Sequence, residues 1–328
     1  MKAQIINKYG DPSVFEPSEV INPKPSSGEV LIKISATSVN PVDWKIRRLG
    51  LPISPDLPAI LGCDIAGTIV AVGPNVSKFN VGDEVFGCGG GVKGMGGTYA
   101  ELIATDENLL AKKPSSLNMR EAAALPLVSI TAWDGLIRAG LKPNENILIH
   151  GGAGGVGHVA IQIAKSIGAK VFTTVSSDEK SELALSLGAD ETINYHKTSI
   201  QEYVESITNG KGFDVVFDAT GGSNISNSFE ASKLSGNVVS IVSSFDADLT
   251  LMHTKGLSLH VVFMLLPMLY NLNRASHGQI MEQVGSLAAS NSLKPIIDPV
   301  AYSLNEIGLA HEKLEGGSAI GKIVIDIG

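Results

Sequence analysis

A glycine-rich turn between an apolar strand and a helix constrains the fold of this chain most. Residues 146–168 read NILIHGGAGGVGHVAIQIAKSIG, with glycines at G-x-G-x-x-G spacing followed by apolar residues at helical spacing. In such a turn the glycines allow a tight reversal, close approach to a pyrophosphate, and packing of helix on strand. The stretch predicts a dinucleotide-binding turn, with a purely structural glycine turn as the alternative. Its residues are Gly152, Ala153, Gly154, Gly155, Val156 and Gly157.

The end of the next strand bears on the choice of dinucleotide. Enzymes that bind NAD usually place an acidic side chain there, on the ribose hydroxyls. This chain has Ser176 and Ser177 instead, with Lys180 one turn later. Hydroxyls and an ammonium would attract a ribose 2'-phosphate, which a carboxylate would repel. We therefore expect NADPH as cofactor, although Ser177 could also cap a helix starting at Asp178 while Lys180 is solvated.

Composition narrows the partners and the compartment. The chain has 328 residues, 44% of them hydrophobic, which is enough for two cores, and its net charge of −8 comes without a basic cluster that would bind nucleic acid. With Cys63 and Cys88 alone, a disulfide framework or a four-cysteine zinc site is not expected. Residues 1–10 lack the organisation of a signal peptide, so we expect a cytoplasmic protein.

The most apolar run, residues 257–270, is too short to span a membrane, which takes about 20 residues, and it contains Pro267. We interpret it as a buried strand that runs into a loop. No membrane partner is expected.

The order of the elements predicts two domains. Residues 1 to about 112 hold β-type runs between turn residues, and 118–141 is helical with a break at Pro126. Strands then alternate with amphipathic helices, which predicts a doubly wound parallel sheet. The expected strands are 146–150, 171–176, 191–195, 213–219, 237–243 and 257–264. A helix at 278–290 follows, and the last strand, in GKIVIDI, is expected to rejoin the first domain.

This arrangement resembles the medium-chain dehydrogenase/reductase superfamily. The resemblance implies an α/β protein with a GroES-like β-rich catalytic domain, 1–124 and 268–328, and a Rossmann domain, 125–267. The segment NPVDWKIRRLG at 40–50 is similar to one in NADPH-dependent enone (alkenal/one) reductases of the zinc-independent quinone oxidoreductase branch, apart from the inserted Leu49. INY at 193–195 also matches that branch. The implied activity is hydride transfer from NADPH to a small-molecule quinone or enone. A homodimer formed through strand 257–264 is the implied assembly.

The resemblance also implies cofactor and substrate contacts. Thr131 would contact the nicotinamide and Tyr195 would hold the adenosine phosphate. Thr220 and Ser243 would lie at strand ends near the ribose and nicotinamide, and Phe263 with Met264 would form one wall of the pocket. Three alternatives remain open: a helix-internal hydrogen bond for Thr131, a sheet-edge cover for Tyr195, and a turn cap for Asp218, which ends the strand before Thr220. The seven histidines show no ligand spacing and are expected to be structural or on the surface.

Zinc-dependent relatives need cysteine and histidine ligands that this chain lacks. At the matching positions it has Asn40, Gly62-Cys63-Asp64 and Leu127. We expect no metal, and we interpret Cys63 as a small buried side chain.

Without a Lewis acid, reduction of a conjugated carbonyl or quinone is favoured, because its developing charge is delocalised. The nicotinamide would deliver hydride in a cleft between the domains. Lys45 is the candidate catalytic donor to the oxyanion, with Asn40 as a second donor. Asn40, Pro41 and Asp43 also form a good helix start, which would leave Lys45 facing solvent.

Two other functions remain open. The chain could bind NADPH without turnover, as crystallins of this branch do. It could instead reduce an enoyl thioester, which would need a basic entrance for a CoA or carrier phosphate. Lys45, Arg47 and Arg48 supply only a faint one.

Overall fold

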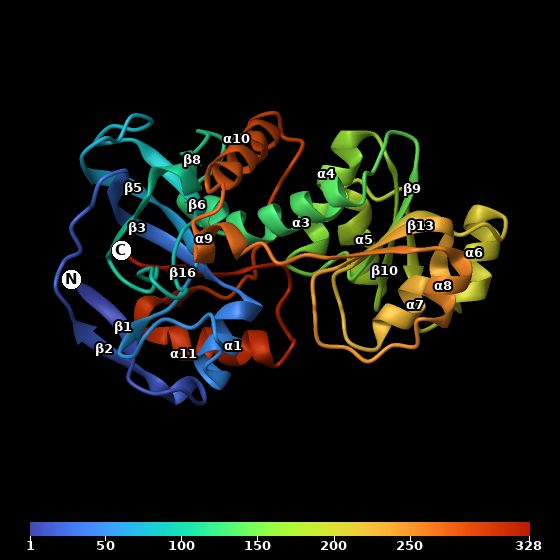
Figure 1. Ribbon diagram of the computed structural model, residues 1–328, viewed down its shortest axis with the longest axis horizontal. Helices are drawn as coiled ribbons and strands as arrows, with labels where there is room; N and C mark the ends of the chain where they lie inside the picture. Colours follow the sequence, from blue (N-terminus) through green and yellow to red (C-terminus); the bar gives the residue numbers. More distant parts are fainter. The chain divides into compact units, whose positions relative to one another are not determined.

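The structure is a computed structural model that describes residues 1–328. The chain folds into two compact units (Figure 1). The first unit comprises Met1–Ile130, Leu265–Asn291 and Pro295–Gly328, and the second comprises Thr131–Met264 with Ser292–Lys294. The unit junctions fall at 130/131 and 264/265, where the sequence suggested 124/125 and 267/268.

The first unit is built on two sheets. A seven-stranded sheet has the order β15-β16-β3-β5-β6-β8, with β7 also paired to β3, and a three-stranded sheet has the order β2-β1-β4. The strands are β1 (Lys2–Ile6), β2 (Phe15–Glu19), β3 (Glu29–Val39), β4 (Ala59–Ile60), β5 (Asp64–Val72), β6 (Glu84–Cys88), β7 (Leu102–Asp106), β8 (Leu110–Lys112), β15 (Tyr302–Ser303) and β16 (Ile323–Asp326). Because β16 pairs antiparallel with β3, the predicted return of the chain end to the first domain is confirmed.

Helices complete the first unit. They are α1 (Pro41–Leu49), α2 (Met119–Ala123), α9 (Leu266–Tyr270), α10 (Ala275–Ala289) and α11 (Ile307–Glu315). The predicted break at Pro126 is confirmed, because α2 ends at Ala123 and α3 (Pro126–Arg138) begins at the proline. The predicted loop before residue 270 is wrong. Pro267 lies in the first turn of α9, where a missing N–H costs nothing.

The second unit confirms the doubly wound parallel sheet. Six strands pair in parallel in the order β11-β10-β9-β12-β13-β14. They are β9 (Asn146–His150), β10 (Lys170–Val175), β11 (Glu191–Asn194), β12 (Phe213–Asp218), β13 (Ser232–Ser240) and β14 (Ser258–Val261). The helices are α4 (Gly157–Ile167), α5 (Asp178–Ser186), α6 (Ile200–Thr208), α7 (Asn224–Ala231) and α8 (Thr250–Lys255). The strand order reverses beside β9, where open α/β sheets bind ligands.

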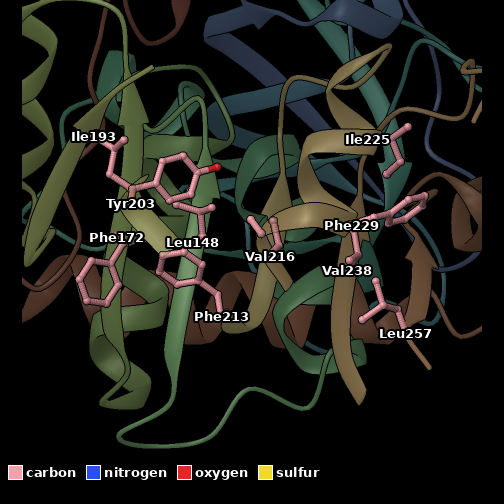
Figure 2. Close-up of a cluster of buried hydrophobic side chains, with 11 residues drawn as sticks. Leu148, Phe172, Ile193, Tyr203, Phe213, Val216, Ile225, Phe229, Val238 and Leu257 are labelled. Atoms are coloured by element: carbon pink, nitrogen blue, oxygen red, sulfur yellow. The ribbon is translucent and has the colours of Figure 1, made fainter. Parts of the chain in front are cut away.

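One face of this sheet packs a hydrophobic core against α6 and α7, which contribute Tyr203 and Phe229 (Figure 2). The strands contribute a row of paired residues, Phe172, Leu148, Val216 and Val238. Side chains two residues apart in a strand share a face. The residues two positions further along these strands therefore lie on the same face, at the carboxyl edge of the sheet. They are Thr174, His150, Asp218 and Ser240. No helix combines the length and apolar composition needed to cross a membrane.

Candidate functional site

The glycine-rich turn joins β9 to α4, and its glycines have different tasks. A Cβ on Gly152 would lie 2.1 Å from Thr173 Oγ1, and one on Gly157 would lie 2.1 Å from the Gly151 carbonyl oxygen. These two positions accept no side chain. A Cβ on Gly154 would meet only the Gly151 carbonyl oxygen, at 3.2 Å. The space in front of Gly154 is otherwise open, so a ligand can approach the backbone there.

The amino end of α4 provides unused donors. Val156 is the N-cap residue and makes no side-chain capping bond, and the N–H groups of Val156 and Gly157 have no partner within the chain. Unsatisfied N–H groups and the helix dipole together attract anions. The turn therefore fits the diphosphate of a dinucleotide.

The structure brings Ser176, Lys180 and Tyr195 to the same edge of the sheet. Lys180 Nζ donates to Ser176 Oγ at 3.1 Å and makes no ion pair. The Tyr195 N–H donates to the Val175 carbonyl at 3.3 Å, and the residue is 54% exposed. Ser177 Oγ accepts the Lys180 N–H at 3.3 Å, so the predicted cap of α5 is confirmed.

At the other end of the predicted cofactor site, Asp218 caps a turn. Its Oδ1 accepts the N–H groups of Thr220 and Gly221, both at 2.9 Å, and the Asn224 amide at 3.1 Å. The capping alternative for Asp218 is confirmed, and its carboxylate fixes the chain around Thr220.

The prediction that Ser243 ends a strand is wrong. β13 ends at Ser240, whose hydroxyl donates to the Val242 carbonyl at 2.8 Å and accepts the Val242 N–H at 3.3 Å, which turns the chain. Ser243 is exposed three residues later. Phe263 is 40% exposed and follows β14, whereas Thr131 and Met264 are buried.

Sequence reasoning missed a buried polar row at the carboxyl edge of the sheet. Thr174, His150, Asp218 and Ser240 are register partners on four adjacent strands, so their side chains share one face. They follow the apolar row of Figure 2 by two residues. Equivalent polar strand ends at residues 150, 174, 218 and 240 were the available signal. The sequence leads us to expect His150 to be structural or on the surface, but it does not predict the row to which His150 belongs.

His150 is neutral in this row. Burial lowers the pKa of His150 to about 4. Thr174 Oγ1 accepts the Gly151 N–H at 3.3 Å and lies 3.2 Å from His150 Nδ1. The hydroxyl and Nδ1 share one hydrogen bond, in which the histidine tautomer decides which group donates. His150 Nε2 and Asp218 Oδ2 are buried without a hydrogen-bond partner.

In the first unit, α1 begins over a second buried network. Asp43 Oδ2 accepts the Asn40 N–H at 2.8 Å, which confirms the predicted helix start. The Asn40 side chain is fully buried. Its Nδ2 donates to Asp64 Oδ2 at 2.7 Å, and its Oδ1 accepts from Lys322 Nζ. The expectation that Asn40 offers a free amide to a substrate is corrected, because both polar atoms of the amide are engaged inside the unit.

Asp64 is the hub of this network. Its Oδ2 also accepts from Ser38 Oγ at 2.5 Å, and its Oδ1 accepts the Leu127 N–H at 2.8 Å. Burial raises the pKa of Asp43 to about 7. A hydrogen bond with Cys88, together with burial, holds the pKa of Cys63 well above its usual value. Cys63 is a buried thiol that lies 3.4 Å from Asp43 Oδ1, as expected for a structural side chain.

Three or more His, Cys, Asp or Glu side chains do not gather anywhere in a form that could hold a metal ion. Asn40 and Leu127 add no thiolate or imidazole to Cys63 and Asp64. The donors at this point are therefore a poor match for zinc, which prefers nitrogen and sulfur ligands.

Lys45 is half-buried on α1 and makes no ion pair, and its Nζ lies 5.7 Å from the centroid of the Trp44 ring. Its basic neighbours are engaged. Arg47 is fully buried and pairs with Glu315, and Arg48 lies 3.5 Å from the same carboxylate. Lys45 is thus the available cation of this helix. Of the three basic residues considered for binding the phosphate of an enoyl thioester, only Lys45 makes no ion pair.

Comparisons with known proteins agree with this fold. Residues 26–115 match the family model of the alcohol dehydrogenase GroES-like domain, and 155–270 match that of the zinc-binding dehydrogenases. The chain is 36% identical to a 2-methylene-furan-3-one reductase of Solanum lycopersicum, over 99% of this chain and 79% of the relative. It is 33% identical to a chloroplastic NADPH-dependent alkenal/one oxidoreductase of Arabidopsis thaliana, with the same coverage.

Solved structures give the same result. An alcohol dehydrogenase superfamily protein from Novosphingobium aromaticivorans superposes over the full length of both chains with a TM-score of 0.94 at 41% identity. The Escherichia coli quinone oxidoreductase complexed with NADPH superposes over both full chains with a TM-score of 0.87 at 28% identity. Fold and glycine turn thus define a two-domain dehydrogenase/reductase. The chain belongs to the medium-chain dehydrogenase/reductase superfamily, in the branch of the quinone and alkenal/one oxidoreductases.

Proposed function

We propose that this protein is an NADPH-dependent reductase of quinones or of the C=C bond of α,β-unsaturated carbonyl compounds. The observation that carries the proposal is the Ser176–Lys180 pair at the end of β10. It places hydroxyl and ammonium groups, and no carboxylate, next to an open dinucleotide turn. Relatives named as quinone and alkenal/one oxidoreductases support the substrate class.

The cofactor residues follow the edge of the sheet. The backbone from Gly152 to Gly157 takes the diphosphate. Ser176 and Lys180 take the 2'-phosphate, with Tyr195 beside the adenosine. Bound there, NADPH supplies the hydride. Thr131, Thr220 and Phe263 contact the nicotinamide end of the cofactor. Ser240 replaces Ser243 as the residue at the end of the neighbouring strand.

Lys45 is the catalytic donor in this proposal. When a hydride adds to the β-carbon of an enone, negative charge develops on the carbonyl oxygen. An ammonium aimed at that oxygen stabilises the transition state more than the ground state. Protonation of the α-carbon then completes the reduction. Asn40, the N-cap residue of α1, contributes by holding the first turn of this helix.

The same proposal covers assembly and compartment. β14 is an edge strand, and Val261 in it is 40% exposed, so it can pair with its copy in a homodimer. Both cysteines are free thiols, which suits a reducing compartment such as the cytoplasm. Light scattering coupled to size exclusion tests the dimer.

Two lysine variants test the cofactor and the chemistry separately. Lys180→Ala is expected to raise the Kd for NADPH about tenfold, by loss of a charge-assisted contact, and to leave the Kd for NADH within about twofold. Lys197→Ala is the matched control, because Lys197 follows the neighbouring strand β11 and its side chain is 70% exposed. Equal effects of Lys180→Ala on both cofactors would refute the 2'-phosphate role.

Lys45→Ala is expected to lower kcat for a small enone at least tenfold while the Kd for NADPH is unchanged. A panel of small quinones and enones, followed by NADPH consumption, measures both. An unmodified protein that binds NADPH but oxidises it with none of these acceptors would favour the non-catalytic binding role instead.

A further inference from the structure

Lys322 is a buried cation that the proposed reaction does not use directly. It precedes β16 and is 3% exposed. Its Nζ donates to Asn40 Oδ1, to the Val39 carbonyl at 3.2 Å and to Asp64 Oδ2 at 3.5 Å. The ammonium therefore has oxygen acceptors for all three of its protons. Such a group is fixed in place and is not free to meet a substrate.

The charges around Lys322 explain why a cation is needed there. Asp43 and Asp64 are 1% and 0% exposed, and Asp64 accepts only from neutral donors apart from Lys322. Arg47, the buried cation of α1 itself, is committed to Glu315. An uncompensated buried carboxylate costs several kcal/mol. Lys322 is the ion-pair partner that allows Asp64 to remain charged in the interior.

The network ends at the first turn of α1. Lys322 donates to the side-chain Oδ1 of Asn40, Asp64 accepts from its side-chain Nδ2, and Asp43 accepts its backbone N–H. Asn40 is thus fixed from three directions. Lys45 lies on the next turn of the same helix. Any displacement of Asn40 is transmitted along α1, because a helix moves as a rigid element.

We propose that Lys322 is a positioning residue of the reductase: a tethered internal cation that holds the first turn of α1, and with it the ammonium of Lys45, in the orientation needed for turnover. This inference rests on the proposed function. Lys322 itself does not touch the substrate or the cofactor.

Chemical rescue tests this role. Lys322→Ala removes the four atoms from Cγ to Nζ, which n-propylammonium replaces. We expect kcat for a small enone to fall at least tenfold, with the KM for NADPH unchanged within about twofold. n-Propylammonium should restore at least a third of kcat, whereas n-propanol, of the same length without charge, should not. The control is Lys313→Ala, which removes a lysine paired with the buried Asp298 of the same unit.

Three results would overturn the proposal. One is a Lys322→Ala protein that is less stable but turns over normally. Another is equal rescue by the amine and the alcohol, which would show that filled space matters and charge does not. The third is a loss of turnover as large in Lys313→Ala as in Lys322→Ala.

A second variant keeps the test decisive if Lys322→Ala does not fold. Asn40→Ser cuts the link to α1 but leaves Lys322 its contacts with Val39 and Asp64, and serine is a good N-cap. We expect a folded protein with the same fall in kcat. Hydrogen exchange in α1 should quicken relative to α11, a readout independent of turnover. Full activity with unchanged exchange would refute the proposal, whereas an inactive unmodified protein would refute the proposed function alone.

Discussion

The carboxyl edge of the second unit's sheet and the network beneath α1 are both polar, but they differ in how their groups are satisfied. At the sheet edge, the N–H groups of Val156 and Gly157 lack partners, and Lys180 makes no ion pair. Beneath α1, Asn40 and Lys322 are buried, and each polar atom of their side chains makes a hydrogen bond. The proposed ligand site thus has hydrogen-bond donors without partners, whereas the polar side-chain atoms of the proposed positioning network have partners within the chain. The two regions should therefore respond differently to substitution.

The largest expected effect is in the closed network. Asp64→Ala leaves the Lys322 ammonium buried without its counter-charge, and we expect it to lower the free energy of unfolding by about 3–5 kcal/mol. Asp326→Ala is the control, because Asp326 is 48% exposed and pairs with Arg120 at the surface, a kind of pair that contributes about 0–1 kcal/mol. Denaturant unfolding measures both. Similar losses in the two variants would contradict the ion-pair role of Lys322.

Opposite pH responses should separate the two regions next. The pKa of Asp43 rises from 3.8 to about 7, so the folded protein holds this proton more tightly than the unfolded chain. Its contribution to stability is present below pH 4 and is lost as the pH rises to 7. The pKa of His150 falls from 6.5 to about 4, so its contribution is present above pH 6.5 and is lost as the pH falls to 4.

The contribution of Asp43 is on the order of 4 kcal/mol and that of His150 on the order of 3 kcal/mol. Asp43→Asn should therefore lessen the loss of stability between pH 4 and pH 7, and His150→Gln should lessen the loss in the opposite direction over nearly the same range. Unfolding free energies measured across this range test both variants, each serving as the control for the other. Parallel profiles for the two variants would contradict the assignments.

Substitutions at two glycines of the turn should affect stability and NADPH binding separately. Gly154→Ala should leave stability unchanged and raise the Kd for NADPH about 10- to 100-fold, roughly 1.4–2.7 kcal/mol, because its Cβ enters the open approach to the turn. Gly157→Ala should instead destabilise the protein, because its Cβ meets the backbone oxygen of Gly151. Binding of NADPH to Gly154→Ala with the original Kd would contradict the proposed path of the diphosphate.

The sequence was enough to predict features that are encoded locally. The glycine turn, the strands around it and the helix start at Asn40 depend on residues within a few positions of one another. Ser243 was predicted at the end of the strand, but the hydroxyl of Ser240 turns the chain three residues earlier. This turn depends on the hydrogen bonds of a single side chain. Lys322 could not be found from the sequence. Its acceptor Asn40 lies 282 residues away, and no local pattern marks the contact.

The smallest effect distinguishes two neighbouring serines. Ser177→Ala removes the cap of α5 and should lower the free energy of unfolding by about 0.5–1 kcal/mol without changing the NADPH/NADH preference. Ser176→Ala should do the reverse, because Ser176 contacts the Lys180 ammonium and caps nothing. We expect a threefold to tenfold loss of preference for NADPH, which corresponds to about 0.7–1.4 kcal/mol. If Ser177→Ala alone changed the preference, the phosphate contact would belong to the capping residue, and a local helix cap would also serve the ligand site.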